Sequence, residues 1–365
     1  MESKQCMRSI TVIFVLILCW SCGSTETESV DPPSNTIEFY YPPNNSNSWD
    51  HLDINSLGWN TATLNDLETF LSNSGTEAFM ILKDGRIVME TYYNGSTAND
   101  PHPWFSAGKT LTAFTMGLAQ QDGFLTIADK VKDYLGSGWT TMPNGKEDLI
   151  SIKNLLTMTS GGDYRNVDLN CTDPSCLEYF ADAGNSWYYH NAFYTLLQPI
   201  LDAAIPQGFD SYFNQQLRSK IGMSGLWIRS GFNRFYVSNA RAMARFGILN
   251  LTRGNWNGEQ LLDESYFNEM TTTSQNLNQS YGYLWWLNGK SSKRLPGSPL
   301  EFQGQLIEQA PTDLIAGMGA NDQKLYVIPS ENLVIIRLGE DGRTSNLGPS
   351  TYDNQLWEKL NTLMY

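Results

Sequence analysis

The sequence is poor in histidine and in positive charge. It holds 3 histidines, and its 24 lysine and arginine residues stand against 38 aspartate and glutamate residues, for a net charge of −14. The H-E-x-x-H motif and paired C-x-x-C motifs are both missing, so we expect no metal site. Because so acidic a protein repels phosphate, we also expect no nucleic-acid partner. Aromatic residues are plentiful, with 11 Trp, 18 Tyr and 16 Phe, which indicates a globular enzyme or binding protein.

The sequence also lacks an apolar run long enough for a permanent membrane span near its start. The run Ile10–Trp20 covers 11 residues and follows two basic residues, which is typical of a signal peptide. Cys22 comes next, in a context that resembles the lipobox of bacterial lipoproteins. We therefore expect a signal over 1–22, lipidation of Cys22 and a polar tether and lead-in over 23–54. The protein would then be anchored in a bacterial envelope, facing the periplasm; plain secretion is the alternative.

Cysteine is scarce, with 5 residues in the chain. Removal of the signal and acylation of Cys22 would leave Cys171 and Cys176, which frame the turn-forming sequence C-T-D-P-S-C. In an oxidising compartment this spacing predicts a local disulfide. Two free thiols in a loop are the alternative.

Strand-like segments occur towards both ends of the chain, and helical patterns lie between them. Residues 78–93 and 324–339 each predict a β-hairpin, the first around Asp84-Gly85. Helices are expected at 108–123, 151–162, 191–204, 210–222, 239–251 and at the C-terminus, and a strand at 281–289. This order predicts an α/β (α+β) fold: one antiparallel sheet formed from both termini and flanked by helices, with an inserted mostly helical region at roughly 125–260 inside a domain of 55–365.

The stretch P-H-P-W-F-S-A-G-K-T at 101–110 has two interpretations. Its Gly-Lys-Thr end resembles that of a phosphate-binding loop, but Pro103 stands where such a loop needs glycine. Proline has a fixed φ and no N–H to offer a phosphate. We therefore expect no nucleotide and no other cofactor.

The second interpretation is S-x-x-K, formed by Ser106 and Lys109 at a helix start. Residues three apart lie on one helix face, so the two side chains can touch. A serine hydroxyl is a weak nucleophile that needs a base, and burial can lower the pKa of a lysine enough for that task. The backbone N–H groups of the helix start would stabilise a developing oxyanion beside Ser106.

Tyr189 and Asn191 form a second motif, Y-x-N, around His190. The phenol can relay a proton, and the amide can hold Lys109 and a substrate carbonyl. His190 should face away from them. No G-x-S-x-G occurs, which argues against an α/β-hydrolase.

Together with L-L-T-M-T-S-G-G at 155–162 and Y-G-Y-L-W-W at 281–286, these motifs resemble the serine β-lactamase and penicillin-binding-protein superfamily. Class C β-lactamases, the esterases similar to them and 6-aminohexanoate-dimer hydrolases are the most similar members. The resemblance covers nearly all of 55–364, in family order. It implies a β-lactamase/transpeptidase-like fold, acylation of Ser106 with proton transfer shared by Lys109 and Tyr189, and hydrolysis by water.

One family motif is altered. Where K-T-G or H-x-G is usual, this chain has Ala320-Asn321-Asp322, so Ala320 replaces a cation that commonly meets a substrate carboxylate. We therefore expect hydrolysis of small neutral or cationic esters or amides and weak or absent β-lactamase activity. The N–H groups of Ser106 and Gln323 would form the oxyanion hole. The expected substrate-binding residues are Asn191, Asn321, Gln323, Trp187 and Tyr283.

Two alternatives stay open. A D-amino-acid-type peptidase or carboxypeptidase acting on cell-wall fragments would need a replacement cation, for which Lys324 is a candidate. A non-catalytic ligand-binding protein on the same fold is the other. Separation of Ser106 Oγ and Lys109 Nζ beyond hydrogen-bond reach would favour that last interpretation. The oligomeric state is left open.

Overall fold

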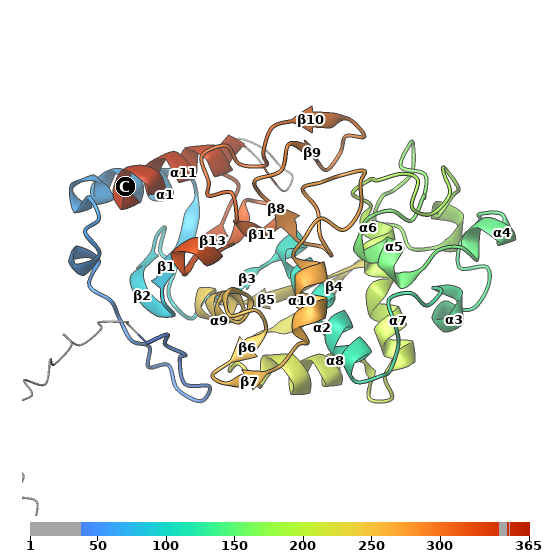
Figure 1. Ribbon diagram of the computed structural model, residues 1–365, viewed down its shortest axis with the longest axis horizontal. Coiled ribbons are helices and arrows are strands. Elements are labelled where there is room, and N and C mark those ends of the chain that lie inside the picture. The colour runs from blue at the N-terminus through green and yellow to red at the C-terminus, as the bar shows by residue number, and fades with distance from the viewer. Residues whose placement is uncertain (1–37, 343–348, 350) are drawn as a thin grey trace, which may run out of the picture. The chain divides into compact units, whose positions relative to one another are not determined.

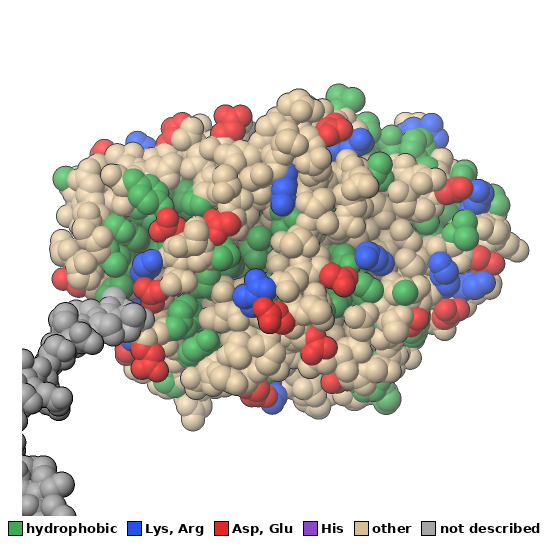
Figure 2. All heavy atoms as spheres, viewed as in Figure 1, with side chains coloured by type: hydrophobic (Ala, Val, Ile, Leu, Met, Phe, Trp, Pro, Cys, Tyr) green, Lys and Arg blue, Asp and Glu red, His purple; other side chains and the backbone are tan. Residues whose placement is uncertain are grey.

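The computed structural model describes residues 38–342, 349 and 351–365, and Glu38–Tyr365 forms one compact unit. The predicted signal peptide, Cys22 and the first part of the tether lie outside the described residues. Within the described part of the chain, no helix is both long enough and apolar enough to cross a membrane. On the face drawn in Figure 2, acidic and basic side chains are interspersed among polar and apolar ones.

A six-stranded antiparallel sheet carries the fold, as predicted, and its strands come from both ends of the unit (Figure 1). In spatial order the strands are β2 (Arg86–Tyr92), β1 (Thr76–Lys83), β13 (Leu333–Gly339), β12 (Gln323–Ile328), β11 (Ile315–Gly319) and β8 (Trp286–Leu287). The predicted turn at Asp84-Gly85 joins β1 to β2, and both residues have positive φ. A Cβ on Gly85 would lie 1.8 Å from the Tyr40 carbonyl oxygen, so only glycine fits there.

Helices cover both faces of this sheet, because its central strands are apolar on both sides. On one face, Leu325 and Val334 border Gly247 of α9 (Ala240–Leu251). The next residue along β12, Tyr326, points to the other face, where its ring lies 5.8 Å from that of Trp357 in α11 (Thr351–Met364). The helix α1 (Leu64–Asn73) packs beside α11 (Figure 1).

The remaining elements lie mainly between β2 and β11 in the chain. The helices are α2 (Lys109–Gln121), α3 (Lys132–Leu135), α4 (Asn144–Glu147), α5 (Ile152–Leu156), α6 (Asn191–Thr195), α7 (Leu197–Ala204), α8 (Gly208–Phe213) and α10 (Glu264–Met270). A small sheet has the order β3 (His102–Pro103), β5 (Asn233–Ser238), β4 (Leu226–Ser230). Two short hairpins complete the unit: β6 (Asn255–Trp256) with β7 (Glu259–Gln260), and β9 (Ser292–Arg294) with β10 (Glu301–Gln303).

Some predicted elements are shorter in the structure, and one small sheet was not predicted. The helix expected at 151–162 ends at Leu156, since Met158 and Gly161 both have positive φ. The strand expected at 281–289 is reduced to β8, because Leu284 has φ 60° and turns the chain. The sheet β3-β5-β4 was not predicted, and β4 and β5 lie inside the region expected to be mostly helical.

Candidate active site

Ser106 lies in a 3-10 turn, Phe105–Gly108, and Lys109 is the first residue of α2. Lys109 Nζ donates a hydrogen bond to Ser106 Oγ at 3.3 Å. Phe105, just before the serine, has φ 47°, a left-handed conformation that a bulky residue rarely adopts. The two S-x-x-K side chains are therefore within the reach that nucleophile activation needs.

The serine turn is clamped between two strands. Trp104 N–H donates to the Tyr236 carbonyl of β5 at 2.8 Å, and Trp104 Nε1 donates to Ser238 Oγ at 2.8 Å. On the other side β11 approaches so closely that a Cβ on Gly319 would lie 2.3 Å from the Trp104 carbonyl oxygen. Glycine at this position is thus a steric requirement for bringing the serine turn against the sheet.

The ammonium group of Lys109 is buried among aromatic rings. The residue is 5% exposed, and its Nζ lies 3.9 Å from the ring centre of Tyr194 and 5.4 Å from that of Tyr189. Among the described residues, no carboxylate pairs with it. Desolvation by burial lowers the pKa of Lys109 from 10.5 to about 7, so that the neutral amine is available near neutral pH.

Tyr189 reaches the same place from the segment before α6. Burial raises the pKa of Tyr189, and a hydrogen bond with Ser106 opposes that rise only in part. The phenol therefore stays protonated and can pass a proton on. Its ring stacks on Trp286 of β8 with 5.7 Å between ring centres. His190 is turned away, with Nε2 3.1 Å from the Asp163 carbonyl oxygen.

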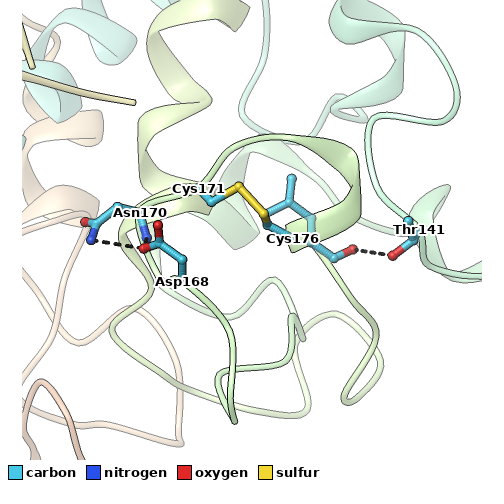
Figure 3. Close-up of a disulfide and its surroundings, with 6 residues drawn as sticks. Thr141, Asp168, Asn170, Cys171 and Cys176 are labelled. Carbon is cyan, nitrogen blue, oxygen red and sulfur yellow. Dashed lines mark hydrogen bonds between the residues drawn. A yellow bond between two sulfur atoms is a disulfide. The ribbon is translucent and has the colours of Figure 1, made fainter. Parts of the chain in front are cut away.

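Asn191 is fixed by a residue that the sequence analysis did not single out. Asn191 Nδ2 and Asn233 Nδ2 both donate to Asn170 Oδ1 at 3.1 Å. Asn170 is held in turn by Asp168, whose carboxylate accepts from Asn170 N at 2.9 Å and from Nδ2 at 3.3 Å (Figure 3). A carboxylate can only accept, so Asp168 fixes which way the Asn170 amide points. Position 170 directly precedes the first cysteine of C-T-D-P-S-C, the one sequence signal for it.

The predicted disulfide between Cys171 and Cys176 is confirmed (Figure 3). The disulfide closes the loop that begins next to Asn170. Just beyond this loop, the Leu177 carbonyl oxygen accepts a hydrogen bond from Thr141 N at 3.2 Å. The disulfide thereby ties the segment that carries Asn170 to the body of the helical region.

We expect the double variant Cys171→Ala/Cys176→Ala to lose about 2 kcal/mol of unfolding free energy, because a short loop regains its entropy in the unfolded chain. Ester turnover should fall by about twofold to tenfold, since Asn170 is less firmly held. Urea unfolding and steady-state kinetics check both numbers. Asn170→Ala is the matched control: it should reproduce the kinetic loss with little change in stability. Full activity in both variants would show that Asn170 does not position the site.

Ser106, Lys109 and Asn191 border a cavity of about 250 Å³, whereas Tyr189 is not among its lining residues. Its lining consists of Phe105, Ser106, Lys109, Asn191, Tyr194, Ser230, Asn233, Arg234, Phe235 and Ala320. Ser106, Lys109 and Asn191 were predicted as site residues, and Ala320 was placed in the altered third motif. The residues from β5 were missed, because the sequence analysis assigned no element to 226–238.

Four predicted substrate-binding residues are not among the residues that line this cavity. Trp187 contacts the rings of Tyr281 and Trp286, the same two rings that Tyr189 contacts. Tyr283 donates to Glu269 at 2.8 Å. Asn321 lies beyond Ala320 in the β11–β12 turn, and Gln323 begins β12, where its side chain accepts from Gly339 N at 3.1 Å. A larger cavity, of about 360 Å³, lies near 44–49 and the start of α9 and includes none of the predicted site residues.

Buried cations hold the turn that brings Ala320 to the cavity. Asn321 and Asp322 both have positive φ, and their carbonyl oxygens accept from Arg337 Nη1 at 2.8 and 3.2 Å. Lys324 is 0% exposed and lies 3.1 Å from Asp322 Oδ1 and 3.0 Å from Asp353 Oδ2 of α11. Lys324 thus points to the α11 face of the sheet, whereas the cavity lies at the turn.

Lys324→Met should cost about 3–5 kcal/mol of unfolding free energy, because it removes the cation between two buried carboxylates. Thermal and urea unfolding at pH 7 measure the loss. The matched control is Lys220→Met, whose exposed partner Glu259 lies at 2.7 Å; it should change stability by less than about 1 kcal/mol. Equal effects of the two substitutions would contradict the structural importance of the buried pair.

A buried S-x-x-K lysine, a Y-x-N tyrosine and a serine turn set against an antiparallel sheet define the class of β-lactamase-like serine hydrolases. Comparison with known sequences agrees. Residues 73–344 match the Beta-lactamase family, and the chain belongs to that family. An uncharacterized protein of Alkalihalophilus pseudofirmus is 21% identical over 301 residues, covering 72% of this chain and 83% of that protein.

Solved structures share the fold. A protein of Bacillus anthracis, provisionally named a 6-aminohexanoate-dimer hydrolase, superposes with a TM-score of 0.63 at 18% identity over 81% of this chain and 80% of its own. A protein of Bacteroides dorei, provisionally named a beta-lactamase, gives 0.65 at 14% identity over 84% and 99%. A family VIII carboxylesterase gives 0.61 at 14% identity over 83% and 97%. The predicted superfamily and fold class are thereby confirmed.

Proposed function

We propose that the protein hydrolyses ester or amide bonds of small molecules through an acyl-enzyme on Ser106. The observation that carries this proposal is the contact of Ser106 Oγ with a buried lysine amine, 3.3 Å away. Lys109, with its pKa lowered to about 7, is suited to accept the serine proton at neutral pH. A solvated lysine would be protonated there and could not act as a base.

The chemistry would run in two halves. The Ser106 proton moves to Lys109 while Oγ attacks the substrate carbonyl, and the tetrahedral oxyanion is held by backbone N–H groups. The leaving group departs with a proton supplied through Tyr189, which yields the acyl-enzyme. Water then attacks the ester carbonyl and gives a proton to the same groups, which return a proton to Ser106 Oγ as the acid leaves.

The oxyanion hole needs two donors. The Ser106 N–H at the helix start is the first, as expected from the sequence. Gln323 was expected to be the second, but Ala320 is the residue of the β11–β12 turn that borders the cavity. We therefore propose the backbone of Ala320 as the source of the second N–H.

The substrate would be small and partly apolar. Phe105, Tyr194 and Phe235 supply aromatic surface to a cavity of about 250 Å³, enough for a short acyl group. The wall at Ala320 carries no cation, so neutral or cationic groups should be accepted there and β-lactamase activity should be weak or absent. Attachment to a bacterial envelope through Cys22 remains part of the proposal.

Intact-protein mass spectrometry tests the function. The chain from Gly23 onward would be exposed briefly to a fluorophosphonate, to p-nitrophenyl esters and to a penicillin, with Ser106→Ala alongside. A mass gain that requires Ser106 supports the proposal. A stable penicillin adduct would favour the peptidase acting on cell-wall fragments. No adduct on folded protein would favour the non-catalytic binding protein.

A further inference from the structure

Arg234 is a cavity-lining cation that the sequence analysis did not single out. It lies on β5, its side chain is 14% exposed, and it shares the cavity wall with Asn233 and Phe235. Its guanidinium carbon lies 5.6 Å from the ring centre of Phe209. An arginine stacked on an aromatic ring is held in place, so the position of its charge relative to the cavity is fixed.

The guanidinium group of Arg234 is only partly used within the described residues. Its Nη2 donates to both carboxylate oxygens of Asp210, each at 2.7 Å. Nη1 and Nε donate to no described residue. Arginine presents five N–H groups in a planar fork, so it can hold a second carboxylate while Asp210, whose side chain is 60% exposed, stays in contact with water.

A second arginine lies opposite Arg234 on the neighbouring strand, outside the cavity lining. Arg229 of β4 is the direct cross-strand partner of Arg234. Directly opposed residues project on the same face of a strand pair, and like charges in that arrangement repel each other. In a chain with a net charge of −14, this pair is a local exception near Ser106; Asp210 already offsets part of the repulsion, and a second anion beside the two groups would offset it further.

We propose that Arg234 binds a carboxylate of the substrate, so that the enzyme prefers esters or amides with a free carboxylate a few bonds from the scissile carbonyl. This inference rests on the proposed acyl-enzyme at Ser106 and revises only the expected charge of the substrate. The wall at Ala320 lacks a cation, whereas the wall at β5 has one. A carboxylate accepts two parallel N–H bonds from a guanidinium fork, which a neutral amide of the same size does not.

The test compares acids with their isosteric carboxamides. In one series the carboxylate is in the acyl half: mono-p-nitrophenyl glutarate against p-nitrophenyl glutaramate. In the other it is in the leaving group: 4-(butanoyloxy)benzoate against 4-(butanoyloxy)benzamide. The readout is the acid-to-amide ratio of kcat/KM within each variant, so that a general loss of activity cancels. The series in which the ratio exceeds one shows which half of the substrate lies against β5.

Arg234→Gln should lower the acid-to-amide ratio by about tenfold to a hundredfold, the loss expected for one charge-assisted contact. Asp210→Asn should raise the ratio, because it removes a competing carboxylate from the same guanidinium. Arg229→Gln is the matched control: it makes the same change in net charge outside the cavity lining, and should shift the ratio by less than about threefold. If Arg234→Gln does not fold, the increase in Asp210→Asn becomes the deciding result.

No preference for the acid in either series, or a preference unchanged in Arg234→Gln, would overturn the carboxylate site. Acylation that still requires Ser106 would then leave the serine-hydrolase function intact. Equal losses in Arg234→Gln and Arg229→Gln would also overturn it, since they would indicate a general field effect in place of a contact. Absence of any Ser106-dependent acylation would overturn the proposed function itself, along with the site that rests on it.

Discussion

Ser106→Ala is expected to lower kcat/KM for p-nitrophenyl esters by about four to six orders of magnitude, to the level left by the binding pocket and oxyanion hole. The methyl side chain cannot form the acyl-enzyme, and among the described residues Lys109 Nζ is hydrogen-bonded to no other hydroxyl. Ser106 Oγ is the group that Lys109 Nζ contacts, at 3.3 Å. Steady-state hydrolysis at pH 8, with ester hydrolysis in buffer subtracted, measures the loss.

The substitution should leave the fold intact, because it removes one hydroxyl from a turn whose backbone is held by Trp104 and by β11. Unfolding curves of the two proteins should therefore coincide within about 1 kcal/mol. Ser230→Ala is a matched control, since Ser230 also lines the cavity but lies away from the lysine contact on β4. If Ser106→Ala kept a tenth or more of the wild-type activity, another nucleophile would be at work.

Lys109→Met is expected to lower kcat/KM by about two to four orders of magnitude while keeping or raising stability. Methionine has nearly the shape of the lysine stem and fits among the same rings. It also removes the cost of an amine that is 5% exposed, a cost seen in the lowering of its pKa to about 7. Opposite signs for activity and stability in one substitution would mark Lys109 as a residue kept for its chemistry.

The pH dependence follows from the same lowered pKa. In wild type, kcat/KM should fall tenfold per pH unit below about pH 7, where Lys109 becomes protonated, and level off above it. Between about pH 7 and its ordinary pKa of 10.5, the unfolded chain holds a proton on this lysine that the folded chain does not. The Lys109 contribution to stability therefore rises with pH across that window and is lost as the pH falls to 7.

Two variants check this assignment. Lys109→Met should lose the acid limb of the rate profile and the matching slope of stability against pH. Tyr189→Phe should lower the rate yet keep the limb near pH 7, because the tyrosine pKa is raised far from that range. A limb that persists in Lys109→Met would assign the titration to another group.

Much of the fold could be predicted because it rests on local patterns. Asp84-Gly85 between two β-rich runs predicts the β1–β2 hairpin, and the structure has positive φ at both residues, as that turn requires. The spacing of Ser106 and Lys109 predicted their contact, because residues three apart lie on one face of a helical turn. C-T-D-P-S-C predicted the disulfide, because a turn within a sequence separation of 5 brings the two cysteines close together.

The cavity itself could not be predicted, because its walls come from segments that are far apart in the chain. Arg234 borders the same cavity as Ser106 only because β5 pairs with β3, next to which the serine turn begins. Asn170 meets Asn191 and Asn233 only after the disulfide loop has folded back on α6. Lys324 lies two residues after the altered motif, yet strand alternation directs it to Asp353 on the other face of the sheet.

The sequence by itself determined the proposed catalytic group of this protein: a serine, its lysine and a tyrosine, in motifs short enough for helix and turn geometry to fix. Tertiary structure alone decided which charges surround that chemistry. Charge at a site depends on which distant strands meet there, and on which cations are already neutralised by buried partners. Neither quantity is encoded in the spacing of neighbouring residues.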